Sequence, residues 1–388
     1  MQRPSITAVE AVLVEGPRPW LFVTIETDEG IRGVGEIPRT RHEPEDVVRL
    51  AGDLIGADPF ETEQLFGAGG RLGAERNDLF TTAMTGGLDM ACWDIKGKLL
   101  DVPVYDLLGG ACHSELRAYA NGWDFPARAI VDRYHRGEEM EPVLDAVVAE
   151  LTDAAVEMSE HGYTAVKFSP FQWGSAANAT GAEIDAAIRA IQAVADAVPD
   201  HVDLLIEGHK NLGVGTARSV ARRLEPIDPF VFEEPVPADI DPLRRVARAS
   251  SIPIATGESF VTHHPFAELI GRTDVGVVQP DVGRAGGITE LQKIAALASA
   301  DRVGFAPHNA AGPVMTFAAA HLGASSPAFA VQETFETAFH PEWSCELLAE
   351  PLKIENGFID VPSRPGLGVV FNEEILAEHT VDSLRVGS

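Results

Sequence analysis

The chain has 388 residues, of which 45% are hydrophobic, and 59 acidic residues stand against 30 basic ones, so the formal net charge is −29. A surface of that sign repels phosphate backbones, which argues against nucleic acid as a partner. No segment resembles a secretory leader or is apolar enough to span a bilayer, so we expect a cytoplasmic protein that does not bind membranes. The acidic excess also suggests a salt-rich cytosol, with an ordinary acidic protein as the alternative.

The first 115 residues predict an α+β domain. Alternation of apolar and polar residues, broken by Gly, Pro and Asp at turns, is typical of β-strands. Three segments with this pattern are predicted to be strands: residues 6–16, 19–30 and 31–38. Helical periodicity follows over residues 44–55 and 81–100, and proline and glycine stop the second helix. We expect an antiparallel β-meander with helices beside it.

From residue 116 to residue 340, short apolar runs alternate with helical stretches rich in Ala, Arg and Glu. Nearly continuous apolar strands that alternate with helices are typical of a parallel sheet, and eight such units suggest a closed β/α barrel. The eight predicted strands are RAYAN (117–121), TAVKFSP (164–170), VDLLIEGH (202–209), PFVFEEP (229–235), IPIATGE (252–258), VGVVQPD (275–281), VGFAPH (303–308) and FAVQET (329–334).

Two segments are predicted to contain irregular structure. Residues 123–150 follow the first barrel strand and combine a short helix with a charged loop, as a lid or as decoration. Residues 357–369, in the tail, carry the turn residues of loops, and no long helix is predicted after the eighth strand.

Polar side chains recur at the ends of the predicted barrel strands. Six of them follow one another at intervals of 23 to 27 residues: Glu207, Glu233, Glu258, Asp281, His308 and Glu333. This interval is one β/α unit, and equivalent positions in successive units lie at the carboxyl-terminal rim of a barrel, where active sites of this fold lie. We therefore expect the six side chains to meet in one pocket.

Three of these carboxylates, Glu207, Glu233 and Glu258, come from adjacent strands. One glutamate alone is more often a solvated loop residue, but three placed together repel one another unless a cation lies between them. Hard oxygen ligands without cysteine favour Mg²⁺ over zinc. The sequence therefore predicts a site for one Mg²⁺ ion.

Asp281 and His308 lie on neighbouring predicted strands. A carboxylate that holds one imidazole nitrogen leaves the other free to face a substrate, so we interpret His308 as a general base rather than a structural histidine. Lys167 lies inside an apolar run and is expected to point into the pocket. There it would bind a substrate carboxylate or assist proton transfer; the alternative is a lysine paired with a neighbouring barrel carboxylate.

His209 lies two residues beyond Glu207, on the same side of the strand, and is the candidate general acid. The alternative is a polar loop in which His209 or Lys210 faces solvent. Glu333 is expected to accept a hydrogen bond from a substrate hydroxyl or from an enolate partner. Four further residues are weaker candidates for substrate contacts, each with a surface or packing role as the alternative: Trp20, Arg39, Arg76 and Trp123.

These residues and their order resemble the enolase superfamily, in particular its mandelate racemase subgroup. The matching motifs cover nearly the whole chain: ACWDIKGKLLDVPVYDLLGG, VKFSPF, LLIEGH, FVFEEP, ATGES, VVQPDVGRAGGIT, APHN and RPGLGV. The resemblance implies an α/β architecture: an N-terminal α+β capping domain over residues 1–115, a modified TIM barrel, (β/α)7β, over residues 116–340, and a segment over residues 341–388 that returns to the cap. The motifs YANGW, VKFSPF and IEGH followed by EEP look most like the acid-sugar dehydratases that act on gluconate or galactonate.

The resemblance also implies a role for each matched residue. The Mg²⁺ ligands would be Glu207, Glu233 and Glu258, and the dyad that removes the proton alpha to the substrate carboxylate would be Asp281 and His308. His209 would protonate the departing hydroxyl, and Glu333 would lie beside the intermediate. Because family members are commonly symmetric assemblies, we also expect a homo-oligomer.

One position departs from the subgroup's racemases, which carry a second lysine where this chain has Ser169, counted here among the weak substrate contacts. Racemisation with two bases needs a proton carrier on each face of the substrate. With Ser169 there, the favoured reaction is Mg²⁺-dependent dehydration of an aldonate to a 2-keto-3-deoxy sugar acid. A racemase, epimerase or sugar-lactone cycloisomerase, with Lys167 as the second proton carrier, is the alternative, and a non-catalytic binding barrel is a more remote one.

Overall fold

The structure is a computed structural model that describes residues 3–16, 18–38, 42–67, 71–72, 78–173, 179–335 and 342–388. Its N-terminal part contains a four-stranded antiparallel sheet in the order β14-β1-β2-β3. The first three strands are β1 (Ile6–Val14), β2 (Trp20–Thr27) and β3 (Arg32–Ile37). The helices beside them are α1 (Pro44–Ala51), η1 (Gly52–Leu54), α2 (Thr62–Phe66), α3 (Leu79–Leu100) and α4 (Val104–Leu107). The predicted meander and its two main helices are confirmed.

Helix α3 packs directly against strand β3. The helix begins at Asp78, whose carboxylate accepts the backbone N–H groups of Phe80 and Thr81. A Cβ atom at Gly33 or Gly35 would collide with a carbonyl oxygen of α3, so only glycine lets the strand and the helix come this close. The two glycines of the IRGVGEIP segment therefore fix the contact between sheet and helix.

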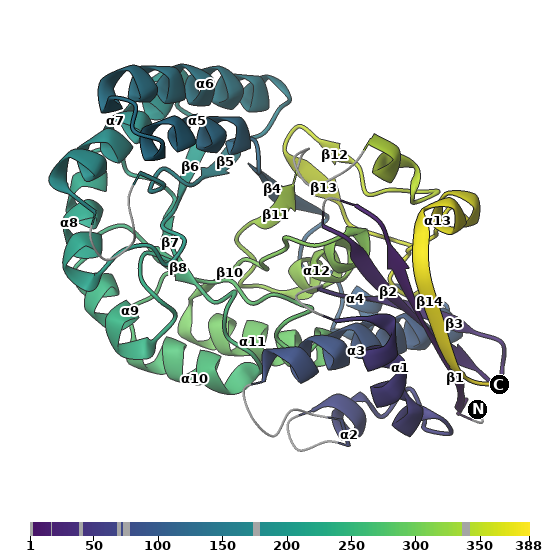
Figure 1. Cartoon of the computed structure of the whole chain (residues 1–388). Helices are drawn as coiled ribbons and strands as arrows, with labels where there is room; N and C mark the ends of the chain where they lie inside the picture. The colour runs from purple at the N-terminus through teal and green to yellow at the C-terminus, as the bar shows by residue number, and fades with distance from the viewer. Residues whose placement is uncertain are drawn as a thin grey trace.

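The C-terminal end of the chain completes the N-terminal sheet. Helix α13 (Glu373–His379) leads into β14 (Thr380–Gly387), which pairs antiparallel with β1 from Ala8 to Val14. Figure 1 shows this last strand in yellow beside the purple first strand. The expected return of the tail to the cap is therefore present.

The barrel consists of eight parallel strands surrounded by helices (Figure 1). Its strands are β4 (Glu115–Asn121), β5 (Ala165–Phe168), β6 (Asp203–Glu207), β7 (Val231–Glu233), β8 (Ile254–Thr256), β9 (Val277–Val278), β10 (Gly304–Phe305) and β11 (Gln332–Phe335). Strand β11 pairs with β4, and the backbone of Phe305 exchanges hydrogen bonds with Ala328 and Ala330 just before β11, which closes the ring. The outer helices are α5 (Phe125–His135), α6 (Met140–Glu160), α7 (Gly181–Ala197), α8 (Val214–Leu224), α9 (Ile240–Ala247), α10 (His263–Arg272), α11 (Ile288–Asp301) and α12 (Pro313–Ser325). All eight predicted strands are confirmed.

The expectations about the two segments with irregular structure are confirmed only in part. Residues 123–150 are mostly helical, because α5 is followed after a short link by α6, which packs against it. The tail over residues 357–369 contains β13 (Phe358–Asp360), which pairs with the first half of β4 and with β12 (Ile354–Glu355). A strand this short has too few residues for a visible alternation, and its pairing depends on a distant partner. Within residues 342–388 the helices are η2 (Glu342–Glu346) and α13, so no long eighth helix follows the barrel there.

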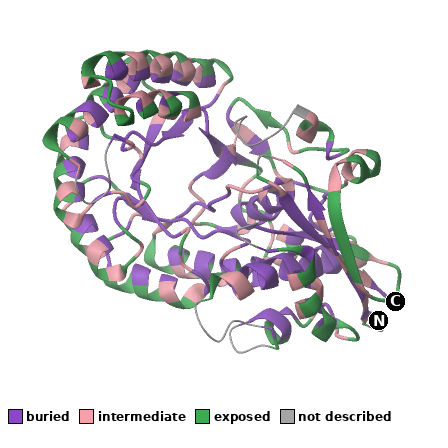
Figure 2. Cartoon of the chain, viewed as in Figure 1, coloured by how far each residue is buried: buried purple, intermediate pink, exposed green. Residues whose placement is uncertain are grey.

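The barrel is filled by one apolar side chain from, or next to, each strand. This inner cluster consists of Tyr119, Ala165, Leu205, Val231, Ala255, Val277, Ala306 and Val331. Most residues of the strands are buried, and the helices are exposed on their outer faces (Figure 2). Polar side chains at the strand ends therefore lie above an apolar floor. Among the described residues, no helix is long and apolar enough to cross a membrane.

Buried carboxylates join the cap to the barrel. Glu36 on β3 accepts backbone N–H groups of Gly312 and Met315 at the start of α12, and burial raises the pKa of its carboxyl to about 7. Asp89 on α3 accepts both the N–H and the hydroxyl of Thr289 at the start of α11, and burial raises its pKa to about 6. Both helix N-termini attract negative charge, so these contacts hold the two domains in register.

Candidate active site

Lys167 lies at the centre of a buried cluster of carboxylates at the barrel mouth. Its ammonium nitrogen is 2.6 Å from Glu233 Oε1, 2.9 Å from Glu333 Oε1 and 3.5 Å from Glu207 Oε2. The side chain is 4% exposed, and its nitrogen lies 5.3 Å from the ring centre of Tyr119 in the barrel floor. Burial alone would lower the pKa of Lys167, but Glu233 and Glu333 outweigh it and raise that pKa well above its usual value. Lys167 is therefore a fixed positive charge.

Glu207 and Glu233 lie side by side with more negative charge than Lys167 neutralises. Burial and the neighbouring Glu207 carboxylate raise the pKa of Glu233 to about 8, and burial also raises the pKa of Glu207. Within the described part of the chain, Glu233 Oε2 is buried without a hydrogen-bond partner. An unsatisfied oxygen on one of two crowded carboxylates suits a second cation, and the all-oxygen donor set suits a hard ion such as Mg²⁺. The residues present therefore fit a divalent metal.

Glu258 lies at the rim and faces cations rather than the other two glutamates. Its carboxylate bonds to Lys210 Nζ, lies 3.0 Å from His308 Nε2 and is 4.0 Å from Arg284 Nη1. Burial alone would raise the pKa of Glu258, but His308 and Lys210 hold it well below its usual range. Among the described residues, no three His, Cys, Asp or Glu side chains surround a common point as metal ligands. A metal held by all three glutamates would need Glu258 to leave Lys210.

Asp281 and His308 are in contact, as their positions on neighbouring strands predict. His308 Nδ1 lies 2.7 Å from Asp281 Oδ2, and the two residues form a parallel backbone bridge beyond β9 and β10. His308 Nε2 points to Glu258 and lies 3.9 Å from Glu333 Oε2. Burial alone would lower the pKa of His308, but Glu333 and Glu258 outweigh it and raise that pKa to about 10. The ring is thus oriented by Asp281 and presents Nε2 to the pocket.

Glu333 is held by two asparagines that the sequence did not single out. Asn121 Nδ2 donates to Glu333 Oε1 over 2.7 Å, and the backbone N–H of Asn309 donates to Oε2 over 2.7 Å. Asn121 ends β4, and Asn309 directly follows His308. Counting strand ends from β4 onward would have brought Asn121 into the set.

His209 and Lys210 follow β6 with left-handed backbone conformations, φ 49° and φ 63°. The His209 ring is exposed at the rim, and its backbone N–H donates to Glu207 Oε1 over 2.6 Å. Partial burial lowers the pKa of His209, as do the cations Lys210, Arg128 and Lys167, against the opposing effect of Glu258. The alternative of a polar loop with a solvent-facing side chain therefore holds for His209, which is exposed, but not for Lys210, which turns inward to Glu258.

Ser169 is fixed by the segment that follows β4. Its backbone N–H donates to Asp124 Oδ2 over 2.9 Å, and its hydroxyl lies 3.2 Å from Arg128 Nη2. Arg128 and Asp124 belong to the 123–150 segment, and no sequence pattern singled them out. Both place charge beside the end of β5.

The weaker candidates divide into two groups. Trp20 is buried in the cap beside Trp343 and Gly312, and Trp123 packs on Phe168 with ring centres 5.4 Å apart. Both positions favour the packing alternative. Arg39 and Arg76 lie outside the described residues.

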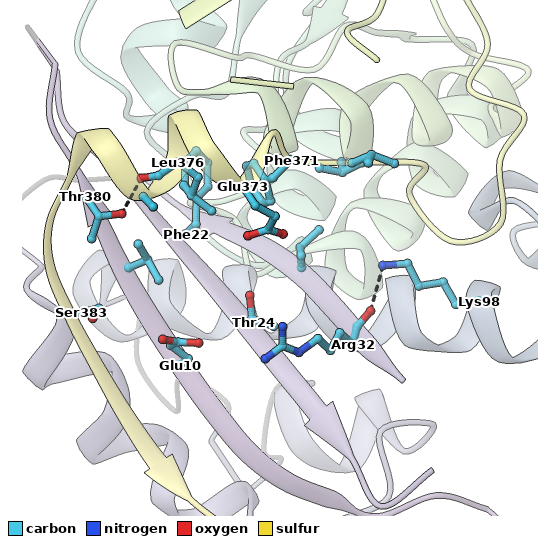
Figure 3. A pocket seen from close by; sticks show the side chains of 15 residues that line it. Glu10, Phe22, Thr24, Arg32, Lys98, Phe371, Glu373, Leu376, Thr380 and Ser383 are labelled. Carbon is cyan, nitrogen blue, oxygen red and sulfur yellow. Dashed lines mark hydrogen bonds between the residues drawn. The ribbon is translucent and has the colours of Figure 1, made fainter. Parts of the chain in front are cut away.

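A cavity of about 600 Å³ lies away from the barrel mouth, on the cap sheet beneath α13 (Figure 3). Phe22, Val12 and Val34 form its apolar floor, and Arg32 and Lys98 lie at one end. These two cations already bind Glu26 and Asp94. This cavity contains none of the predicted site residues.

The sequence matches both parts of one enzyme family. Residues 1–109 match the mandelate racemase/muconate lactonizing enzyme N-terminal domain, and residues 150–375 match the enolase C-terminal domain-like family. The chain belongs to the enolase superfamily, in its mandelate racemase/muconate lactonizing enzyme branch. The family prediction from its motifs is confirmed.

Named relatives in this family include two sugar-acid dehydratases. The chain is 34% identical over 371 residues to D-galactonate dehydratase from Xanthomonas euvesicatoria pv. vesicatoria (strain 85-10), covering 92% of this chain and 90% of the relative. It is 33% identical over 372 residues to D-gluconate dehydratase from Thermoproteus tenax, covering 94% of this chain and 71% of the relative. A solved mandelate racemase/muconate lactonizing enzyme structure from Labrenzia alexandrii DFL-11 superposes with a TM-score of 0.85 at 32% identity, covering 97% of both chains. The similarity thus extends through both cap and barrel.

Proposed function

We propose that this chain is a hydro-lyase that dehydrates an aldonate such as gluconate or galactonate to a 2-keto-3-deoxy sugar acid. The observation that carries the proposal is the imidazole of His308, which Asp281 holds beside the buried cluster of Lys167 and carboxylates. The two named dehydratases at about a third identity support the same class of reaction.

His308 Nε2 removes the proton alpha to the substrate carboxylate. Asp281 holds Nδ1, which fixes the orientation of the ring and stabilises the imidazolium that forms. Neutral imidazole is required for this step, and the carboxylates of Glu333 and Glu258 raise the pKa of His308. A cation bound by Glu258 would reduce this effect and so favour the neutral base.

Glu207, Glu233 and Glu258 would hold one Mg²⁺ ion, which would neutralise the substrate carboxylate as it gains negative charge. Lys167 adds a permanent positive charge on the floor of the same pocket. Glu333, fixed by Asn121 and Asn309, is positioned to accept a substrate O–H group.

His209 donates a proton to the departing beta hydroxyl. The alpha C–H and beta C–O bonds break and water leaves. The enol product then tautomerises to the 2-keto acid, gaining a proton on the beta carbon and losing the proton of its enol hydroxyl. The exposed position of His209 at the rim allows it to regain a proton from solvent.

The same contacts argue against an epimerase on this scaffold. An epimerase that uses Lys167 as its second base needs that lysine to lose its proton. The ammonium is shared among three carboxylates, which keep its pKa high. Ser169 also cannot act as a base at neutral pH.

A panel of aldonates tests the proposal in buffered D₂O with Mg²⁺. The expected result is a 2-keto-3-deoxy product from at least one aldonate, with activity lost in excess EDTA. Deuterium exchange into recovered substrate without any keto product would favour the epimerase instead. No reaction and no exchange with any aldonate would contradict the proposed class.

A further inference from the structure

Arg128 is a charged side chain at the barrel mouth that the proposed mechanism does not use. It lies on α5, directly after the first barrel strand, and its Nη2 atom lies 3.2 Å from the hydroxyl oxygen of Ser169. Ser169 is two residues beyond Lys167, at the end of β5. The cation that is missing from β5 at Ser169 is thus supplied from α5, which precedes β5 in the chain.

The guanidinium of Arg128 is held in a fixed position. Asp124 binds it in a two-pronged pair, with Nε 2.8 Å and Nη2 2.9 Å from the two carboxylate oxygens. The ring of Phe125 lies beneath it, with its centre 4.4 Å from the guanidinium carbon. Such bidentate and stacked contacts pre-organise an arginine, so little conformational entropy is lost when it binds a ligand.

Part of the guanidinium remains available to a ligand. Within the described residues, the hydrogen bonds of Arg128 use Nε and Nη2, while Nη1 carries two further N–H donors. The side chain is 26% exposed, whereas Asp124 beneath it is 1% exposed. Ser169 directly follows β5 and contacts Nη2, so the open donors of Arg128 lie near the end of that strand, at the barrel mouth.

We propose that Arg128 is a substrate-binding residue that donates hydrogen bonds from Nη1 to a hydroxyl on the carbon chain of the sugar acid. This inference rests on the proposed function for the class of ligand. Asp124 already neutralises the guanidinium, so the pair suits a neutral hydroxyl better than a second carboxylate. Arginine does not lose its proton in proteins, so it binds at this position without acting as a second base.

Binding measurements test this role without depending on turnover. Calorimetry with Mg²⁺ in the His308→Asn background, which is expected not to turn over, compares galactonate, which carries a hydroxylated chain, with lactate, which carries the carboxylate and one hydroxyl but no further chain. Arg128→Met should weaken galactonate binding about tenfold and change lactate binding less than about twofold. Ser169→Ala, which removes the serine hydroxyl but leaves the Arg128–Asp124 pair, should weaken galactonate binding by less than about threefold.

The outcomes separate this inference from the proposed reaction. Equal effects of Arg128→Met on both ligands, or no effect on either, would overturn the role of Arg128. If Arg128→Met selectively loses galactonate binding and the wild type converts no aldonate, the role of Arg128 would be sustained and the proposed dehydration contradicted. Arg128→Lys, which keeps the charge but loses the two-pronged geometry, should show the same selective loss to a smaller extent.

Discussion

The cap–barrel joint and the barrel mouth are both built from buried carboxylates, but the two regions pair them differently. At the joint, Glu36 and Asp89 accept hydrogen bonds from helix N-termini and a hydroxyl. At the mouth, Glu233 and Glu258 face Lys167 and Lys210. A backbone N–H group cannot move away from the carboxylate that it binds, whereas a lysine side chain can give up its place beside a carboxylate to another cation. The joint is therefore structural, and the mouth is arranged to exchange partners.

The largest expected effect is the loss of catalytic rate when His308 at the barrel mouth is replaced. His308→Asn keeps a donor toward Asp281 but lacks a basic nitrogen, so kcat on the best aldonate should fall at least about a thousandfold. Steady-state kinetics measures the loss, and calorimetry should show Mg²⁺ binding retained. A variant that keeps a tenth of the wild-type rate would exclude His308 as the base.

Lys167→Met should be the most destabilising change at the mouth. It removes the cation that three buried carboxylates share, so the free energy of unfolding in EDTA should fall by about 3 kcal/mol or more. Urea titration measures this, and saturating Mg²⁺ should restore more stability to the variant than it adds to the wild type. Lys353→Met, at an exposed lysine, is the matched control. A loss below about 1 kcal/mol would mean that the carboxylates are not charged around Lys167.

The contact between cap and barrel at Asp89 predicts that the stability of the fold decreases as the pH rises. Burial raises the pKa of Asp89 from 3.8 to about 6, so the folded chain binds this proton more tightly than the unfolded chain. The stability linked to Asp89 is present below pH 3.8 and is lost as the pH rises through 6. Between pH 5 and pH 7.5 the wild type should therefore lose about 1 kcal/mol more than Asp89→Asn in urea titrations. Equal losses in the two proteins would show that Asp89 is already ionised at pH 5.

The smallest effect is expected at the rim. The Lys210 side chain is 30% exposed, so Lys210→Met should cost less than about 1 kcal/mol of stability. The ion pair with Glu258 no longer has to break in this variant, so Mg²⁺ should bind about threefold more tightly by calorimetry. Weaker Mg²⁺ binding in the variant would mean instead that Lys210 stabilises the site when Mg²⁺ is bound.

Much of the fold follows from local patterns in the sequence. The barrel strands are short apolar runs that alternate with helices. Because each strand and helix repeat the same unit, the positions of the polar residues at the strand ends could be found by counting along the chain. That count brought His308 to Asp281. Lys167 was expected to point into the pocket, and its contacts match the alternative of a lysine paired with barrel carboxylates. Motifs typical of the mandelate racemase subgroup, spread over the chain, likewise identified the family from local sequence.

Tertiary structure alone decided the features that depend on distant partners. Strand β14 is mostly exposed and shows no useful alternation, and its place beside β1 depends on residues at opposite ends of the chain. Lys210 turns to Glu258, and Arg128 reaches Ser169, because helices and strand ends far apart in sequence meet at the mouth. A local pattern records which face of an element is buried, but a long, flexible charged side chain takes its direction from whichever opposite charge the fold brings within reach.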